Sequence, residues 1–499
     1  MNIVNYEFME KTQNNSLQVL MRFIILCFCM FIAVGISYLF FQNQSLRLDE
    51  SQSLWQSSHS SKMIISLIGQ DVHVPLYPLL LHVWLLIFGT DIPVARTLSL
   101  IFFVLSIPIF YILGKRLYAK DTSSFATVLF SISPFMNWYA NEIRMYSLFV
   151  FVALIHMYFL IDILKNDSRR SWIGFTVSSL VGIYTHYFFF LLLLVDFIFY
   201  LTNRKNFGFN AFKNFLRVAL ITSAAFLPWM TYVFFLGKIS NASPNLLSPT
   251  SVDLFNMFSE FFIGFQNDFI NTIFLSLWPI VILFGFLALR RNMVIQPGTI
   301  YLIMVFSIPT TIAFFGSIYI RPIFLSRYLI FTMPAMYLLM GWVLSRYPRF
   351  LMYVLSCLAV LTFIFGFTVE GLSEMTPTKE NYREVATYLE ANTLPSDIIV
   401  VSAPFTIYPF IYYYHGFNKV LTLPVWDQNK VGPIPSFKED QLPGDINSIT
   451  KDHTNMWLIL SYDQGYSEKI RIYLDTHYQR LVIKKISPGL VLYEYKFSY

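Results

Sequence analysis

The chain has 499 residues, of which 56% are hydrophobic and only 13% are charged. Soluble domains carry roughly 25% charged residues, so this composition excludes an ordinary soluble protein and indicates an integral membrane protein. The formal net charge of +6 does not indicate nucleic-acid binding, because the basic residues form short clusters between apolar segments. The three cysteines lie inside apolar segments, so the sequence predicts neither a disulfide framework nor a cysteine-based zinc site.

Eleven apolar stretches approach the length of about 20 residues that a membrane-spanning helix needs. The first of them has no small-residue cleavage site, so it predicts a membrane helix and not a cleaved signal peptide. The spans are expected at residues 20–41, 96–114, 122–138, 145–164, 172–186, 187–202, 214–236, 270–289, 298–319, 327–345 and 350–369.

The positions of Lys and Arg predict how these spans are oriented. If the N-terminus is cytoplasmic, the basic clusters at 114–121, 164–171, 203–206, 289–292 and 345–349 all fall on the cytoplasmic side. Since the number of spans is odd, the C-terminal region is then external, that is, periplasmic or extracellular. The expected location is a cell membrane crossed several times, with a bacterial inner membrane preferred.

The segment 74–89 decides whether this orientation holds. It is apolar but only 16 residues long, and counting it as a span would reverse every later loop. A short apolar run favours a helix lying on the membrane surface. We therefore expect 43–95 to be one long external loop, with interfacial helices at 51–69 and 75–88.

Charged residues in this loop are candidates for function. Two adjacent carboxylates, Asp49 and Glu50, follow Arg47 near its start. By itself, an acidic pair in a loop most often belongs to a solvated surface. Downstream, Asp71 and His73 precede a segment whose prolines set a rigid entry geometry. His73 is either a hydrogen-bonding residue at a helix edge or a ligand for a phosphate oxygen or a metal.

Further ionisable residues occupy the short external turns between later spans. Glu142 and Arg144 lie in one turn and His186 in another, and Arg321 and Arg327 are external, against the usual cytoplasmic bias of cations. A Glu–Arg pair in a turn can be a simple salt bridge. Ionisable groups at this depth are costly, however, and therefore indicate function. The planar guanidinium of Arg suits phosphate recognition.

The composition changes after Val369, where the apolar spans end. Residues 376–403 predict a polar helix, a proline turn and a buried strand, and 455–497 predict a strand, a helix and a hairpin around "SPG". The chain is thus expected to have an all-α polytopic membrane domain at 1–369 and a small soluble α/β domain at 370–499.

Five segments in this order resemble one family. They are "RLDE", "DVHVPLYPLLLHVW", "ARTLSLIFFVLSIPIFYILGKRLY", "NEIRMYSL" and "SRYLIFTMP". The chain resembles the dolichyl-phosphate-mannose protein mannosyltransferase and aminoarabinose transferase group of GT-C fold glycosyltransferases, and it is most similar to bacterial family 39 enzymes. It departs from the pattern at Val74, where a first proline is usual.

The resemblance implies a membrane hexosyl- or pentosyltransferase that takes a sugar from a polyprenyl-phosphate carrier. The family's first-loop acidic motif matches Asp49 and Glu50, and its second acidic position matches Glu142 best. The expected reaction is a direct, inverting displacement by an acceptor hydroxyl. Asp49 is the expected general base, and Glu50 orients it or is a second acid. The acceptor (protein, lipid or glycan) and the sugar are not specified by the sequence.

Some residues are candidates both for binding the donor phosphate and for binding a metal. The leaving phosphate needs positive charge, for which we expect Arg321 and Arg327, with His73 and Arg144 behind them. The residue types also allow a divalent metal cation, although their spacing matches no metal motif. The candidate metal ligands are Asp49, Asp71, His73, Glu142 and His186.

A polytopic transporter or lipid-linked sugar flippase is the main alternative. Transporters tend to have inverted repeats and charges near the middle of the membrane, whereas here the ionisable residues gather at one face and no repeat is visible. A non-enzymatic scaffold would not need acids and cations in four separate external turns.

Overall fold

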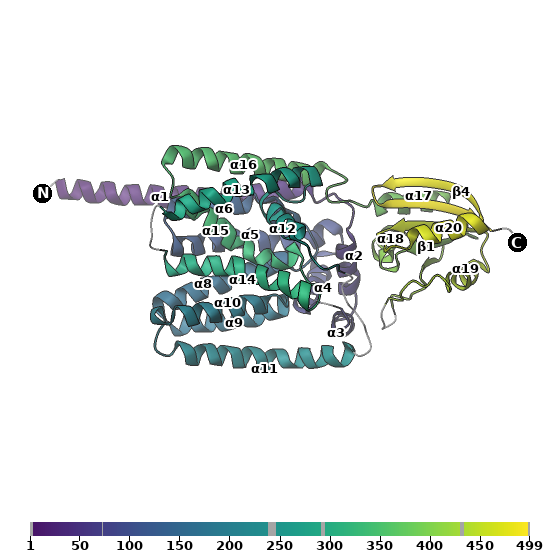
Figure 1. Cartoon of the computed structure of the whole chain (residues 1–499), viewed down its shortest axis with the longest axis horizontal. Coiled ribbons are helices and arrows are strands. Elements are labelled where there is room, and N and C mark those ends of the chain that lie inside the picture. Colours follow the sequence, from purple (N-terminus) through teal and green to yellow (C-terminus); the bar gives the residue numbers. More distant parts are fainter. Residues whose placement is uncertain (1–2, 72, 238–245, 291–294, 430–433, 498–499) are drawn as a thin grey trace. The chain divides into compact units, whose positions relative to one another are not determined.

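The computed structural model describes residues 3–71, 73–237, 246–290, 295–429 and 434–497. The chain forms two compact units (Figure 1). The membrane unit comprises Met1–Gln42, Arg96–Pro228 and Pro244–Gly371. The second unit comprises Asn43–Ala95, Trp229–Ser243 and Leu372–Tyr499, so the long loop predicted at 43–95 is grouped with the C-terminal residues.

Within the described part of the chain, seven helices are long and apolar enough to cross a membrane. They are Val19–Phe40 of α1 (Ile3–Phe40), α5 (Ile92–Leu117), α8 (Tyr146–Asn166), Ala211–Phe235 of α11 (Ala211–Gly237), α14 (Pro297–Tyr319), the segment Ser326–Leu344 made of η2 (Ser326–Thr332) and α15 (Met333–Leu344), and α16 (Arg349–Leu372). A polytopic membrane protein is confirmed, but the expected count of about eleven spans is not.

The other expected spans are also helical. The stretches at 172–186, 187–202 and 270–289 become α9 (Arg169–Thr185), α10 (Phe189–Thr202) and α13 (Asp268–Arg290). The stretch at 122–138 is divided between α6 (Lys120–Ser131) and α7 (Pro134–Ala140). A new helix begins there because Pro134 suits a first helical position and the Ser133 hydroxyl accepts a hydrogen bond from the Met136 N–H at 3.3 Å.

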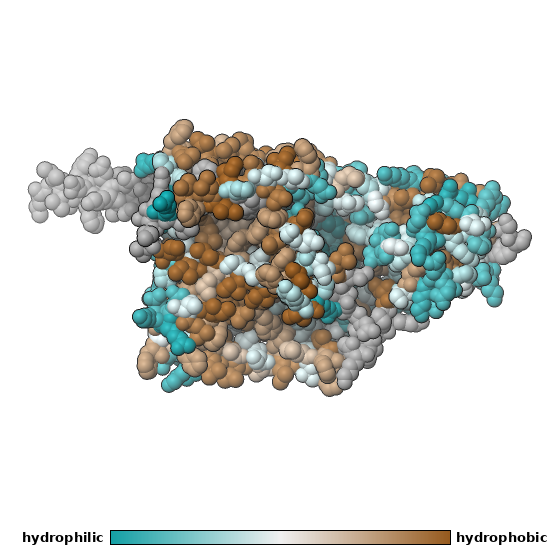
Figure 2. Space-filling model, in the orientation of Figure 1, coloured by the Kyte–Doolittle hydropathy of each residue, from teal (hydrophilic) through white to brown (hydrophobic). Residues whose placement is uncertain are grey.

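The surface of the membrane helices is strongly apolar. Large side chains point outward from them, with Leu39 of α1 80% exposed and Phe350 of α16 81% exposed. Figure 2 shows this as broad hydrophobic areas over the helices. Such exposure would be costly in water over so wide an area, so it is explained by contact with lipid.

Polar side chains inside the membrane unit are hydrogen bonded to one another. His156 of α8 has its Nε2 atom 2.6 Å from Oδ2 of Asp196 of α10, and Tyr301 of α14 donates to the other carboxylate oxygen at 2.7 Å. All three side chains are buried. The network therefore links three helices through buried polar contacts.

The segment before α5 contains three helices and not two. They are α2 (Leu48–Ser57), α3 (Ser61–Gly69) and α4 (Leu76–Phe88), which pack on one another. The single helix expected at 51–69 is divided between α2 and α3 near Ser60, which begins α3 in an extended conformation. The helix expected at 75–88 is present as α4.

The C-terminal residues form the predicted α/β domain around a five-stranded sheet. Its strand order is β2-β1-β3-β5-β4, with β1 parallel to β2 and β3, and with β5 antiparallel to both β3 and β4. The strands are β1 (Ile398–Ser402), β2 (Val420–Thr422), β3 (Asn455–Ser461), β4 (Gln479–Ser487) and β5 (Leu490–Lys496). The hairpin between β4 and β5 is at the predicted "SPG" turn.

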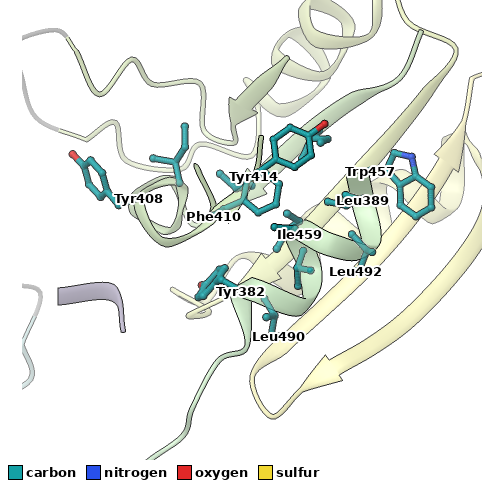
Figure 3. Close-up of a cluster of buried hydrophobic side chains, with 14 residues drawn as sticks. Tyr382, Leu389, Tyr408, Phe410, Tyr414, Trp457, Ile459, Leu490 and Leu492 are labelled. Carbon is teal, nitrogen blue, oxygen red and sulfur yellow. The ribbon is translucent and has the colours of Figure 1, made fainter. Parts of the chain in front are cut away.

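Helices cover both faces of this sheet. Successive residues of β1 and β3 point to opposite faces, so each strand contributes to two cores. One core joins the sheet to α17 (Tyr382–Asn392) and α18 (Ile407–Tyr413) (Figure 3). The other joins it to α19 (Leu442–Thr450) and α20 (Ser467–His477). Burial on both faces explains why β1 is a continuous apolar run in the sequence.

Candidate active site

The acidic pair Asp49–Glu50 lies in the first turn of α2, where acidic residues are favoured by the helix dipole. The Glu50 carboxylate is buried and its Oε2 atom accepts a hydrogen bond from the Arg47 N–H at 3.0 Å. Glu50 therefore stabilises the start of the helix by capping it. Asp49 is half-buried beside it. The two carboxylates, which are equivalent in the sequence, thus have different surroundings.

Asp49 lies within electrostatic range of the C-terminal domain. Tyr462, just after β3, donates a hydrogen bond to Glu380 Oε2 at 3.1 Å. Burial raises the pKa of Tyr462 far above its ordinary value, and the charges of Glu380 and Asp49 raise it further. Burial also raises the pKa of Glu380, which the Arg47 charge lowers. We call Arg47, Asp49, Glu380 and Tyr462 the Asp49 cluster.

Glu380 and Tyr462 were not predicted from the sequence. They lie more than 300 residues from Asp49 in the chain, in the predicted C-terminal α/β domain. A Glu in the strand-free stretch before α17 and a Tyr in a loop are ordinary surface residues by pattern. Only the fold of the second unit brings them to the start of α2.

Asp71 belongs to the same unit but is held by a different set of side chains. Its Oδ2 atom accepts hydrogen bonds from Gln52 Nε2 at 3.3 Å and Gln56 Nε2 at 3.0 Å. Both amides come from α2, so Asp71 fixes the turn before α4 against that helix. His73 is half-buried two residues further on. The pairing makes Asp71 a positioning residue for the loop that carries His73.

A second cluster lies in the membrane unit and contains Tyr139, Glu142, Glu260 and Arg327. We call it the Glu142 cluster. Burial raises the pKa of Tyr139 well above its ordinary value. The charges of Glu142 and Glu260 raise this pKa further, and the charge of Arg327 lowers it. Glu142 is only 4% exposed. Two carboxylates and one guanidinium thus surround a buried phenol on the side predicted to be external.

Glu260, on α12 (Ser251–Ile263), was not singled out from the sequence. The residue is half-buried, but its Oε2 atom is buried and has no hydrogen-bond partner among the described residues. Burial raises its pKa to about 7, although a hydrogen bond from Ser326 and the charge of Arg327 both lower it. An acidic residue on an amphipathic helix is usually solvated, so the sequence pattern gave no reason to single out Glu260.

The remaining predicted residues are placed differently. His186 follows α9, stacks on Phe149 with ring centroids 4.8 Å apart, and accepts a hydrogen bond from the Phe188 N–H at 3.1 Å. Arg144 is buried in the turn of Glu142. Arg321 is exposed after α14, and its side chain has no hydrogen bond or ion pair among the described residues. Of the two arginines expected to stabilise the leaving phosphate, Arg327 belongs to the Glu142 cluster and Arg321 does not.

The candidate metal ligands do not form a metal site in the described residues. Asp71 and His73 belong to the second unit, whereas Glu142 and His186 belong to the membrane unit. No group of three or more His, Cys, Asp or Glu side chains that could hold a metal occurs in the described ranges. The Oδ2 atom of Asp71 accepts hydrogen bonds from two amides. We derive no step through a metal.

Comparison with known proteins agrees with this architecture. A family model described as dolichyl-phosphate-mannose-protein mannosyltransferase matches residues 72–232. No curated protein sequence matches the chain.

Solved structures match over nearly the whole chain. ArnT from Cupriavidus metallidurans in the apo state has a TM-score of 0.62 at 13% identity, covering 96% of this chain and 98% of that one. The chain has a GT-C fold. ArnT bound to undecaprenyl phosphate has a TM-score of 0.60 at 14% identity, covering 94% and 97%. The oligosaccharyltransferase AglB from Archaeoglobus fulgidus, in complex with an inhibitory peptide and a dolichol-phosphate, has a TM-score of 0.56 at 12% identity, covering 95% and 74%.

The GT-C fold confirms the fold class expected from the sequence, including the small C-terminal α/β domain.

Proposed function

We propose that this GT-C protein is a membrane glycosyltransferase. It transfers a sugar from a polyprenyl-phosphate donor to an acceptor hydroxyl of a protein, lipid or glycan on the external face of a cell membrane. The observation that carries the proposal is the GT-C fold over nearly the full chain, shared with ArnT bound to undecaprenyl phosphate. The match of the mannosyltransferase family model to residues 72–232 supports it. A transporter is not favoured, because the structures that share the fold include glycosyltransferases.

In the proposed reaction, the acceptor oxygen attacks the anomeric carbon while the bond from that carbon to the donor phosphate breaks. The acceptor proton passes to a carboxylate, and the polyprenyl phosphate leaves with the bonding electrons. The configuration is inverted because the attack comes from the face opposite the phosphate. A positioned base of this kind contributes about 10²–10⁴-fold in rate.

Asp49 is the proposed base. It is half-buried in the first turn of α2, and its backbone is fixed because Glu50 caps the same turn. Glu50 is buried with its Oε2 atom on the Arg47 N–H, which makes it a positioning residue for Asp49. In this proposal Asp49 takes the proton, and Glu50 holds the turn.

The leaving phosphate is proposed to be stabilised in the membrane unit by Arg327. A guanidinium can hold two phosphate oxygens at once and stays charged at any working pH. Tyr139 and Glu142 lie in the same cluster. Arg144, buried in the same turn as Glu142, and His73 and His186, at the edges of helices, are the further candidates for orienting the donor.

The proposed function is tested with purified protein and radiolabelled polyprenyl-phosphate sugars in the presence of a membrane extract that supplies acceptors. Asp49→Asn should lower transfer at least about a hundredfold while the protein keeps its apparent melting temperature. Asp91→Asn is the matched control, since Asp91 is an exposed acid of the same unit and its substitution should change transfer less than about twofold.

Two results would overturn parts of this reasoning. Full transfer by the Asp49→Asn protein excludes Asp49 as the base. Transfer that needs a nucleotide sugar and proceeds without any lipid carrier excludes the proposed donor class.

A further inference from the structure

Tyr462 lies at the carboxyl end of a parallel strand of the C-terminal sheet. It directly follows β3, which is parallel to β1, and β1 is in turn parallel to β2. The chain passes from β1 to β2 on one side of the strand order, and from β3 to β4 and β5 on the other. Open α/β sheets bind ligands outside the carboxyl ends of neighbouring parallel strands whose connections leave in opposite directions. The strand order therefore makes the Tyr462 end of β1 and β3 a candidate binding position.

The backbone of Tyr462 has a conformation that a tyrosine rarely adopts. Its φ is +50°, in the left-handed region, where a Cβ atom crowds the backbone. The residues on both sides are fixed, because the Ser461 and Tyr382 hydroxyls share a 2.6 Å hydrogen bond and Asp463 Oδ1 accepts from three successive N–H groups leading into α20. Glycine would adopt this conformation more easily, and bulky residues held in it cluster at functional sites. A tyrosine here therefore indicates a use for its side chain.

The half-buried Tyr462 side chain presents an oxygen whose proton is already donated. Its hydroxyl donates to Glu380 Oε2 at 3.1 Å. Burial, and then the charge of Glu380, raise the pKa of Tyr462, so the hydroxyl stays protonated. Among the residues that the structure describes, no other hydrogen bond reaches this hydroxyl. A phenol oxygen in this state can still accept a hydrogen bond, so Tyr462 offers an acceptor atom to a ligand.

Helix α2, which carries Asp49, packs on the same domain. A backbone N–H two residues before α2 donates to the Tyr413 hydroxyl at 2.9 Å, and the centroid of the Trp55 ring lies 4.9 Å from that of Tyr408. Both tyrosines belong to α18, which follows β1, and α2 and α18 are parts of one compact unit. These contacts hold the proposed base within electrostatic range of Tyr462.

We propose that Tyr462 binds the acceptor substrate and that Glu380 is its positioning residue. The Tyr462 oxygen accepts a hydrogen bond from an O–H or N–H group that lies beside the attacking hydroxyl of the acceptor, and the attacking hydroxyl gives its proton to Asp49. The C-terminal domain thereby takes part in recognising the acceptor. This inference rests on the proposed function, because it concerns the acceptor side of the same transfer reaction.

The test is steady-state transfer by the full chain from a radiolabelled polyprenyl-phosphate sugar, with membrane extract titrated as the source of acceptor. Tyr462→Phe keeps the ring and removes the oxygen, so the half-saturating amount of extract should rise about three- to tenfold. The half-saturating donor concentration should change less than about twofold, and the apparent melting temperature should be kept. The extract is offered intact and after protease digestion. A Tyr462→Phe effect that persists after digestion supports an O–H group of a lipid or glycan, and one lost together with transfer supports an acceptor protein.

Further variants separate acceptor binding from a structural role. The matched control is Tyr466→Phe, which loses the same atom four residues later from a ring stacked on Phe437 at 4.6 Å, and it should change the half-saturating amount of extract less than about twofold. Glu380→Ala should raise this amount as Tyr462→Phe does, whereas Glu380→Gln keeps an oxygen that accepts the Tyr462 hydrogen bond and should restore most of the wild-type value. In the Tyr462→Phe protein, Glu380→Ala should add no further loss of acceptor use.

Three outcomes would overturn the inference. If the wild type transfers sugar and Tyr462→Phe needs no more extract than the wild type, Tyr462 does not bind the acceptor and the proposed function still stands. If Tyr462→Phe weakens the use of donor and acceptor equally and lowers the melting temperature, structural damage accounts for the loss. If the wild type transfers no sugar from any polyprenyl-phosphate donor, the proposed function fails and this inference fails with it.

Discussion

Glu260 offers a direct measurement of how a buried charge in the membrane unit affects stability. Its pKa is raised from 4.5 to about 7, chiefly because burial disfavours the carboxylate. The groups that face it are Ser326 and Arg327, which favour the charged form, and Asp253, which opposes it. Replacing Glu260 by Gln keeps the shape of the side chain and removes the titration.

The sign of the effect follows from proton binding. Between pH 4.5 and about 7 the folded protein keeps the Glu260 proton, whereas the unfolded chain has lost it. Stability is therefore full below pH 4.5 and is lost as the pH rises through about 7. A pKa difference of 2.5 between the folded and the unfolded protein corresponds to about 3 kcal/mol of unfolding free energy. Glu260→Gln should abolish this loss.

The assay is the apparent melting temperature of detergent-solubilised protein between pH 5 and pH 8. The wild type should lose a few degrees more than Glu260→Gln over this range, as expected for about 3 kcal/mol in a large domain. Glu374→Gln is the matched control, because Glu374 is exposed and its removal should leave the wild-type profile unchanged. Parallel profiles for the wild type and Glu260→Gln would refute the assignment of a buried, neutral Glu260.

Three further substitutions test packing in the two units. His156→Leu leaves the buried Asp196 carboxylate without its imidazole partner and should lower the free energy of unfolding by about 3–5 kcal/mol. The double substitution with Asp196→Leu should lower it less, and a thermal double-mutant cycle measures the difference. Gly264→Ala should destabilise the membrane unit strongly, because Gly264 has φ +73° and a Cβ atom there would lie 2.1 Å from Glu370 Oε1; an unchanged melting temperature would contradict this. Leu389→Ala, in the fully buried core of α17, should cost about 2–5 kcal/mol and increase amide exchange in the sheet, while exchange in the membrane helices stays unchanged.

Much of the fold could be predicted because it is written in local patterns. Long apolar stretches predicted α5, α8, α14 and α16 within a few residues. The alternation in 455–497 predicted β3, α20 and the β4–β5 hairpin. The stretch at 122–138 was read as one span because its hydropathy is continuous; the cap at Ser133 and Pro134 divides it, and hydropathy does not register caps.

Only part of the candidate site could be predicted from the sequence. Arg327 and Glu142 could be found because charges between apolar spans are rare and therefore visible. Glu380 lies among other polar residues, and Glu260 lies on an amphipathic helix; a carboxylate in either setting is ordinarily solvated and has no distinguishing pattern. Arg321 and Arg327 look alike in the sequence, yet Arg321 is exposed and Arg327 belongs to the Glu142 cluster.

The sequence by itself determined that this chain lies in a membrane and that its C-terminal part is a small α/β domain, and it predicted that acids and arginines mark one face. These properties depend on composition and on short periodicities, which need no knowledge of distant residues. The tertiary structure alone decided that Glu50 caps a helix while Asp49 lies within electrostatic range of Tyr462, and that Glu260 lies within electrostatic range of Arg327. The physical reason is that burial and electrostatic partners arise from contacts between residues far apart in the chain, and those contacts exist only once the chain has folded.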